Sequence, residues 1–253
     1  MPLSIASLNS GSNGNCYYIG NEDDAVLIDV GISCRETERR MARLELSIRK
    51  VRAIFISHEH SDHIRGVEVL SRKHGIPVYM TLLTYSQSRM RPDPSLVRSF
   101  LAHEPVEIGS LTIHPIPKQH DGVDPCSFSV SSNGTTVGVF TDIGIACDQV
   151  AERFSQCHAA FLEANYDEKM LQDGNYPIHL KRRIRGGRGH LSNTQALETF
   201  MWYRAPFLKL LLLSHLSANN NHPQIVLDLF QPHTNGVQVT VASRHEASQV
   251  YCI

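Results

Sequence analysis

Three histidines and an aspartate lie within six positions, as His58, His60, Asp62 and His63, directly after the apolar run 53–56. The apolar run predicts a β-strand, and because side chains alternate along an extended chain, His58 and His60 point to the same side. Asp62 and His63 fall at the start of the next helical stretch and face a second position. Imidazole binds zinc or iron, carboxylate binds harder ions such as manganese, and a mixed set without cysteine indicates a hydrolytic centre rather than a structural zinc. The spacing therefore predicts a site for two metal ions at the end of a strand.

At this run the chain resembles the metallo-β-lactamase superfamily, whose signature is His-x-His-x-Asp-His followed by a histidine, an aspartate and a last histidine. The later positions match His120, Asp142 and His215. Each of them sits where an apolar, strand-like run gives way to turn residues, and ligands carried by strands converge there at one edge of a sheet. For His120 alone, a surface histidine beside a turn is the alternative.

The resemblance implies two divalent metal ions per chain, Zn2+ or Mn2+, with Fe2+ as a third option. It assigns one ion to His58, His60, His120 and Asp142, and the other to Asp62, His63, His215 and the same, bridging Asp142. Asp29 ends the apolar run 25–28 and matches an early aspartate of the family that braces the ligand loop. Because nitrogen and oxygen ligands accept all three metals, the donor set does not select among them.

The composition predicts one α/β domain, 1–253, because 253 residues that are 42% hydrophobic can form a single core. No apolar run approaches the roughly 20 residues that cross a bilayer, and the first residues lack the pattern of a secretory signal. Six scattered cysteines predict free thiols, so we expect a cytoplasmic protein with no membrane partner. The net charge of −1 gives no overall basic signature, so a polyanion would need a local basic patch.

Strand-like and helical runs alternate along the whole chain. Strands are expected over 3–8, 16–19, 25–29, 53–57, 78–80, 111–116, 127–131, 135–141, 159–162, 208–214 and 237–241. Helices are expected over 35–46, 64–74, 82–90, 148–154, 177–185, 193–203 and 223–230. Asn133-Gly134 predicts a tight β-hairpin, and Phe200 and Trp202 are expected in the core. The pattern alone indicates mixed α/β; the resemblance implies the metallo-β-lactamase αββα sandwich, two mixed β-sheets flanked by helices.

Members of the superfamily that process tRNA 3′ ends carry a glutamate at a strand end and a histidine between the bridging aspartate and the last ligand. Glu163 and His190 match these positions. The extended arm with which those enzymes hold tRNA has no evident counterpart in this sequence. A tRNA-processing-like endoribonuclease is therefore only an alternative.

A resemblance to the YycJ/WalJ-like branch of bacterial metallohydrolases runs from the first strand to near the carboxyl terminus. It rests on residues 10–16, 162–167, 176–184, 189–193 and 214–221. Proteins of this branch are associated with degradation of DNA from the 5′ end and with mismatch repair. The resemblance thus implies a 5′-to-3′ DNA exonuclease with DNA 5′ ends as substrate and a role in DNA repair.

The matched residues suit phosphodiester hydrolysis. Two ions about 3.5–4 Å apart can lower the pKa of a shared water to near neutrality and stabilise charge on phosphate oxygens. We expect the resulting hydroxide to attack phosphorus while Asp62 positions it. His190, oriented and kept charged by Glu163, is the candidate proton donor to the leaving oxygen. The alternatives for these two residues are an ordinary loop histidine and an ordinary strand-end carboxylate.

Two segments are candidates for binding substrate phosphates. The candidates are Lys181, Arg182 and Arg185 in the densest basic segment, and Ser12, Asn13 and Asn15 in a glycine-containing loop. Basic side chains neutralise phosphates without reading sequence, and backbone N–H groups of such a loop can surround an anion. A solvated helix face and a tight turn between strands are the respective alternatives.

Three classes of function remain open from the sequence. The first is a two-metal DNA exonuclease. The second is a small-molecule metallohydrolase acting on a cyclic phosphodiester, thioester or lactone, which needs the metals but no basic track. The third is a non-catalytic protein that keeps the fold. Salt-sensitive binding of DNA separates the first class from the second, and metal content tests the third.

Overall fold

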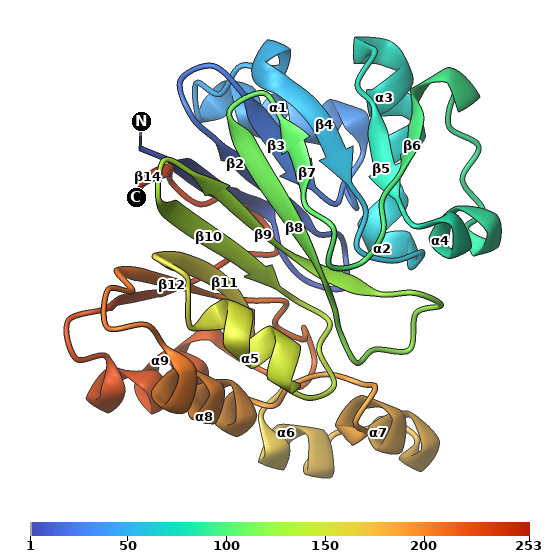
Figure 1. The fold of residues 1–253 in the computed structure, drawn as a ribbon. Helices are drawn as coiled ribbons and strands as arrows, with labels where there is room; N and C mark the ends of the chain where they lie inside the picture. The colour runs from blue at the N-terminus through green and yellow to red at the C-terminus, as the bar shows by residue number, and fades with distance from the viewer. Residues whose placement is uncertain (1) are drawn as a thin grey trace.

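The computed structural model describes residues 2–253 and shows two seven-stranded mixed β-sheets packed face to face, with helices on both outer faces (Figure 1). The strands of the first sheet are β1 (Ser4–Asn9), β2 (Cys16–Gly20), β3 (Ala25–Ile28), β4 (Val51–Phe55), β5 (Val78–Met80), β6 (Val97–Ser99) and β14 (Tyr251–Cys252). Those of the second are β7 (Val106–Ile108), β8 (Leu111–Pro117), β9 (Cys126–Ser132), β10 (Thr135–Phe140), β11 (Ala159–Glu163), β12 (Leu210–Ser214) and β13 (Gln238–Val241). The predicted αββα sandwich is confirmed.

The strand orders are β14-β1-β2-β3-β4-β5-β6 and β13-β12-β11-β10-β9-β8-β7. Strands β3 to β6 are parallel to one another, and so are β10 to β13. Parallel strands end at the same edge of their sheet, so the residues that follow β4, β10, β11 and β12 can meet there. The predicted hairpin joins β9 to β10, where Asn133 and Gly134 both have positive φ, at 47° and 81°, as a type I′ turn requires.

Helices cover the outer face of each sheet, and shorter ones lie beside the ligand loops. They are α1 (Cys34–Arg43), α2 (Ser61–Ile64), α3 (Val67–His74), α4 (Leu82–Gln87), α5 (Asp148–Phe154), α6 (Glu168–Asp173), α7 (Ile178–Arg185), α8 (Asn193–Tyr203) and α9 (Pro223–Phe230). Helices α1 and α3 pack on the first sheet, and α5, α8 and α9 on the second (Figure 1). Among residues 2–253, no helix is long and apolar enough to cross a bilayer.

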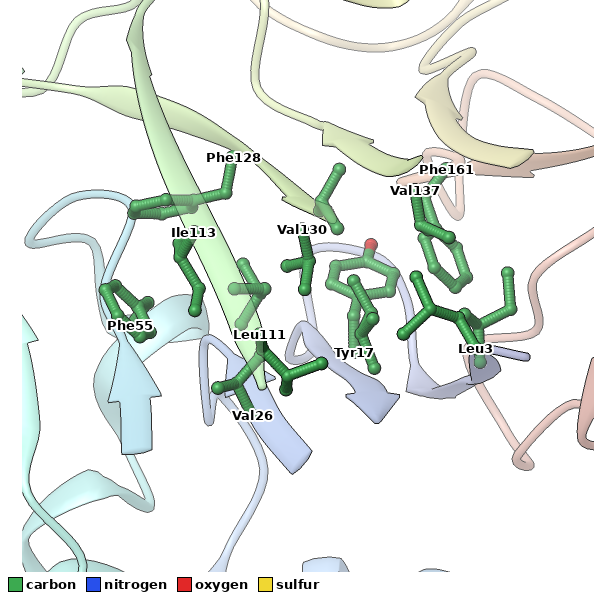
Figure 2. Close-up of a cluster of buried hydrophobic side chains, with 14 of the residues drawn as sticks. Leu3, Tyr17, Val26, Phe55, Leu111, Ile113, Phe128, Val130, Val137 and Phe161 are labelled. Atoms are coloured by element: carbon green, nitrogen blue, oxygen red, sulfur yellow. The ribbon is translucent and has the colours of Figure 1, made fainter. Parts of the chain in front are cut away.

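A hydrophobic core fills the space between the two sheets. Figure 2 shows side chains from both sheets meeting there, including Tyr17 and Phe55 from the first and Phe128 and Phe161 from the second. The ring centroids of Tyr17 and Phe161 are 4.8 Å apart, and those of Phe55 and Phe128 are 5.7 Å apart. This packing fixes one sheet against the other, and with it the loops at the shared edge.

The structure departs from the predicted elements in a few places. Strands β6, β7 and β14 and helix α6, none of them longer than six residues, were not predicted. The helix predicted over 64–74 begins only at Val67, as α3, and Ile64 ends the separate short helix α2; Gly66 lies between them, where a Cβ would come within 2.0 Å of the Ile32 carbonyl oxygen. The core prediction is right for Phe200, which is fully buried, and wrong for Trp202, which is 71% exposed. Residues two apart on a helix point about 200° apart, so they cannot share one buried face. All six cysteines are free thiols, as predicted.

Candidate active site

The predicted ligands come together where strands of both sheets end. Asp142 follows β10 and His215 follows β12, while Asp29 follows β3 at the same edge. All three adopt the left-handed backbone conformation, with φ of 55°, 58° and 59° respectively. Such residues are uncommon outside glycine and cluster at functional sites, where the surrounding structure enforces them. Here the sharp turn redirects each side chain from the strand into the site.

The first group of possible ligands is His58, His60 and His120, whose ring nitrogens lie within 4.8 Å of one another. The Nε2 of His58 is 2.9 Å from the Nδ1 of His60. Burial lowers the pKa of His58 well below its usual range, lowers that of His60, and brings that of His120 to about 4. These imidazoles are therefore neutral near pH 7, the form in which they bind metals.

The second group is Asp62, His63 and His215, again with ligand atoms within 4.8 Å. Asp142 lies between the two groups. Its Oδ2 is 3.1 Å from the Nε2 of His63, and its Oδ1 is 3.5 Å from the Nδ1 of His215 and 3.9 Å from the Nε2 of His120. This position agrees with the bridging role that the family resemblance implies for Asp142.

Three polar atoms of the predicted ligands lack a protein partner. The Nε2 of His120, the Nε2 of His215 and the Oδ2 of Asp142 are buried and make no hydrogen bond. Buried polar groups in proteins are almost always paired, so atoms without a partner call for one from outside the chain. Unpaired atoms of two histidines and a carboxylate, with one histidine from each ligand group, fit divalent cations.

The charge balance points to cations as well. Burial opposes a charge on His215, but Asp142, Asp62 and Glu163 outweigh it and raise its pKa to about 10. Burial likewise opposes a charge on His63, and Asp142 is the main cause that raises the pKa of His63 well above its usual range. The negative charge of the carboxylates is thus compensated by protons on these two rings, and a bound metal ion would compensate it in their place.

Asp29, the predicted support of the ligand loop, makes hydrogen bonds to that loop. Its Oδ1 accepts a hydrogen bond from the Ser57 backbone N–H at 2.8 Å, and its Oδ2 accepts one from the Ser57 hydroxyl at 2.8 Å. The same Oδ2 lies 2.7 Å from the Nδ1 of His63, and both side chains are fully buried. A hydrogen bond from Nδ1 to a carboxylate fixes the ring orientation and turns Nε2 toward the site, where it lies 3.1 Å from the Asn15 side-chain nitrogen.

Glu163 and His190 form a hydrogen-bonded pair beside the metal ligands. The Oε1 of Glu163 is 2.8 Å from the Nδ1 of His190 and 2.9 Å from the Nδ1 of His215. Its Oε2 accepts from the backbone N–H groups of Ile143 and Leu191. Burial opposes the charge of Glu163, but His190 and His215 outweigh it and lower its pKa to about 2. Glu163 is therefore ionised, and it orients a predicted ligand and the candidate proton donor together.

A pocket of about 230 Å³ opens over these groups. Its wall includes predicted site residues, among them His60, Asp62, Asp142, His190 and His215. His190 is partly exposed to this pocket, with a side-chain exposure of 17%, whereas Glu163 behind it is at 0%. A substrate can therefore reach the histidine of the pair but not the carboxylate.

Of the six predicted substrate-binding residues, only one lines this pocket. Ser12 lines the pocket. Asn13 donates to the Arg244 carbonyl oxygen, and Asn15 is fully buried, so both are engaged within the protein. Lys181, Arg182 and Arg185 lie on α7 but outside the residues that line the pocket. Their roles in substrate binding stay predictions.

Further residues line the pocket. Arg183, which belongs to the predicted basic segment, lines it together with Leu180 and Ile184, which were not predicted; the three-to-four spacing of these positions on α7 was the available signal. Asp121, next to His120, has a buried Oδ1 without a hydrogen bond that lies 3.2 Å from the Nε2 of His120. The guanidinium of Arg183 forms an ion pair with Asp121.

Two sheets of this order, with histidine and aspartate ligands at their common edge, define a metal-dependent hydrolase of the metallo-β-lactamase fold. Residues 24–215 match a family described as the β-lactamase superfamily domain. The chain belongs to the metallo-β-lactamase superfamily.

Sequence relatives extend this result. The chain is 31% identical over 230 residues to exodeoxyribonuclease YycJ of Bacillus anthracis, and this alignment covers 89% of this chain and 86% of the relative. It is 32% identical over 219 residues to exodeoxyribonuclease WalJ of Streptococcus pneumoniae, covering 85% and 81%. The structure of the metallo-β-lactamase fold protein YhfI from Bacillus subtilis superposes with a TM-score of 0.75 over 100% of this chain and 99% of that one, at 18% identity. That last similarity concerns the fold alone.

Proposed function

We propose that this protein is a two-metal phosphodiesterase that degrades DNA from the 5′ end in the 5′-to-3′ direction. One observation carries the proposal: a buried Glu163 holds His190 at 2.8 Å at the wall of the pocket that contains the predicted ligands. This pair supplies a proton donor where phosphodiester hydrolysis needs one. The similarity to two proteins named exodeoxyribonucleases supports DNA as the substrate. A role in DNA repair, a cytoplasmic location and a single domain over 1–253 stay predictions.

The seven predicted ligands would hold two divalent cations, Zn2+ or Mn2+, with Asp142 common to both. Bound cations of this kind supply Lewis acidity, which polarises a phosphoryl oxygen and lowers the pKa of water. Asp62 lines the pocket, and its Oδ2 lies 3.6 Å from the Nε2 atoms of both His63 and His215. Its carboxylate is therefore placed to accept a hydrogen bond from the attacking water and to orient it.

His190 would protonate the leaving oxygen. Its Nδ1 is bound to Glu163, so Nε2 is the nitrogen that can pass a proton to a substrate in the pocket. Hydrolysis that leaves the phosphate on the shortened strand breaks the bond from phosphorus to the 3′ oxygen of the terminal nucleotide. The proton from Nε2 then neutralises that oxygen as it departs, and Glu163, bound to Nδ1, orients the ring for this transfer.

The substrate is tested with end-labelled duplex DNA that bears either a 5′-phosphate or a 5′-hydroxyl, in the presence of Mn2+, with Asp142→Ala as control. We expect release of mononucleotides that depends on Asp142 and favours the 5′-phosphate. No release with Zn2+ or Mn2+, from protein that holds two ions, would contradict the proposal and favour a small-molecule metallohydrolase.

The proton donor is tested separately with His190→Ala. We expect a rate loss of about 10²–10⁴-fold on ordinary DNA. The loss should be much smaller when sulfur replaces the bridging 3′ oxygen, because a thiolate leaves without a proton. An equal loss on both substrates would show that His190 has another role.

A further inference from the structure

A second cavity, of about 490 Å³, adjoins the active-site pocket. Ser217 lines both cavities, so a single residue separates or joins them. Ser10 lines the second cavity and accepts a hydrogen bond at 2.8 Å from the backbone N–H of His215, a predicted metal ligand. The second cavity therefore begins one residue away from the metal centre. Its volume is in the range of about 300–1,000 Å³ that holds small ligands.

The wall of this cavity carries an unsatisfied cation, Arg244. The Nη1 of Arg244 is buried and makes no hydrogen bond. Its Nη2 is 3.4 Å from the Ser12 hydroxyl and 3.4 Å from the Asn13 side-chain oxygen, which hold the guanidinium toward the loop that also lines the active site. None of the residues that line the cavity is acidic, within the part of the chain described, 2–253. A buried guanidinium nitrogen without a partner fits an anion, and phosphate matches its fork of donors.

One part of the wall is apolar. It is formed by Leu216 after β12, Pro223 at the start of α9, Val241 at the end of β13 and Ala242 after it. The other part is polar and, besides Arg244, includes the side chains of Asn221, His222 and His245. A wall with an apolar part and a cation suits a ligand with one flat, weakly polar part and one anionic part. A nucleoside 5′-monophosphate has this composition.

We propose that this cavity is the subsite for the 5′-terminal nucleotide of the strand, with the 5′-phosphate on Arg244 and Ser12 and the base against the apolar wall. The proposal rests on the proposed function, since it places the terminal nucleotide next to a centre that cleaves the following phosphodiester. It explains how one centre distinguishes a strand end from an internal position: only an end carries a phosphate that Arg244 can bind without continuing into a further nucleotide.

The first test is the preference for a 5′-phosphate, measured as the ratio of kcat/KM on 5′-phosphorylated and 5′-hydroxyl duplexes. We expect Arg244→Gln to reduce this ratio by about tenfold or more, because a charge-assisted contact to phosphate is lost. Ala218→Phe, which narrows the cavity from an exposed loop position, should also reduce it. The matched control is Arg49→Gln, an exposed arginine that precedes β4 at the opposite end of that strand, and its ratio should equal that of the wild type.

The second test is binding of deoxyadenosine 5′-monophosphate and of deoxyadenosine, by calorimetry on the metal-loaded protein. We expect the monophosphate to bind about tenfold or more tightly, and the difference to vanish in Arg244→Gln. A protein that cleaves DNA with the same ratio in wild type and Arg244→Gln would overturn the subsite and leave the proposed function standing. A wild type that cleaves no DNA would overturn the proposed function, and monophosphate binding then decides the subsite alone. Thermal unfolding of each variant verifies that it is folded.

Discussion

Replacing Asp29 by asparagine tests whether the brace behind the ligand loop sets the metal affinity. Asp29 has a φ of 59°, and asparagine tolerates this conformation as well as aspartate, so the substitution adds little backbone strain. Asparagine can keep the hydrogen bond that Oδ1 accepts from the Ser57 N–H. At the other position, however, an NH₂ donor would face the Nδ1 of His63, where Oδ2 accepts at 2.7 Å.

In Asp29→Asn, the proton of the His63 ring is expected to move from Nδ1 to Nε2. To accept from asparagine, the Nδ1 of His63 must lose its proton, and the neutral ring then carries the proton on Nε2. That nitrogen lies 3.1 Å from the Oδ2 of Asp142 and is the one that faces the site. Loss of such a bracing contact lowers metal affinity by about 10–100-fold, which corresponds to about 1.4–2.8 kcal/mol.

The assay is competition with a chromophoric chelator, which resolves the two metal equivalents of Asp29→Asn and wild type. We expect one equivalent to weaken by the stated factor, because His63 belongs to the second ligand group, and the other to change less. Asp228→Asn, at an exposed carboxylate on α9, is the control and should bind as the wild type does. Two equivalents with wild-type affinity in folded Asp29→Asn would refute the role of the brace.

Three further predictions concern stability. Gly31→Ala should prevent folding of the ligand loop and abolish metal binding, measured by metal content, because a Cβ there would lie 1.7 Å from the Asp62 carbonyl oxygen. Removing the metals with a chelator should lower the Tm measured by calorimetry. The corresponding loss in the free energy of unfolding is about 2.7 kcal/mol for a metal previously present at 100 times its Kd. The hydrogen bond from Arg39, together with Arg40, holds the pKa of Glu36 below its usual range. The ion pairs of Glu36 with these arginines therefore stabilise the fold above pH about 4.3, and this stabilisation is lost as the pH falls through the lowered pKa of Glu36. The stability advantage of wild type over Glu36→Gln, from urea unfolding at pH 3–7, should therefore shrink toward pH 3, and an advantage independent of pH would contradict the ion pairing.

The ligand run was predictable because its information is local. Side chains two apart on a strand share a side, so His58 and His60 could be paired from spacing alone. Glu163 and His190 came only from the family resemblance, since nothing in the spacing of a strand-end glutamate and a loop histidine 27 positions later brings them together. Their contact depends on how β11 and the loop before α8 are placed, which is a property of the whole sheet.

The position of Arg244 was even less predictable from the sequence than the pair Glu163 and His190. It reaches Ser12 across 232 positions of sequence, and the segment that carries it follows an edge strand of the second sheet, β13. Neither its charge nor its neighbours distinguish it from other arginines in the sequence. Only its unsatisfied nitrogen, which is a property of burial in the folded chain, sets it apart.

The arrangement of the ligands also links catalysis to stability. His58, His60, Asp62 and His63 follow β4 of the first sheet, whereas His120, Asp142 and His215 follow strands of the second. Each predicted ligand group therefore contains residues from both sheets, and a cation in either group would join the two layers at an edge where carboxylates and residues with positive φ are concentrated. Cations would offset the charge of these carboxylates and cross-link the sheets at once. For this reason a chelator should destabilise the whole sandwich rather than loosen the loops alone, and the unfolding transitions followed by near-ultraviolet and far-ultraviolet circular dichroism should shift together. A shift seen in the near-ultraviolet signal alone would mean that the metals order only the loops.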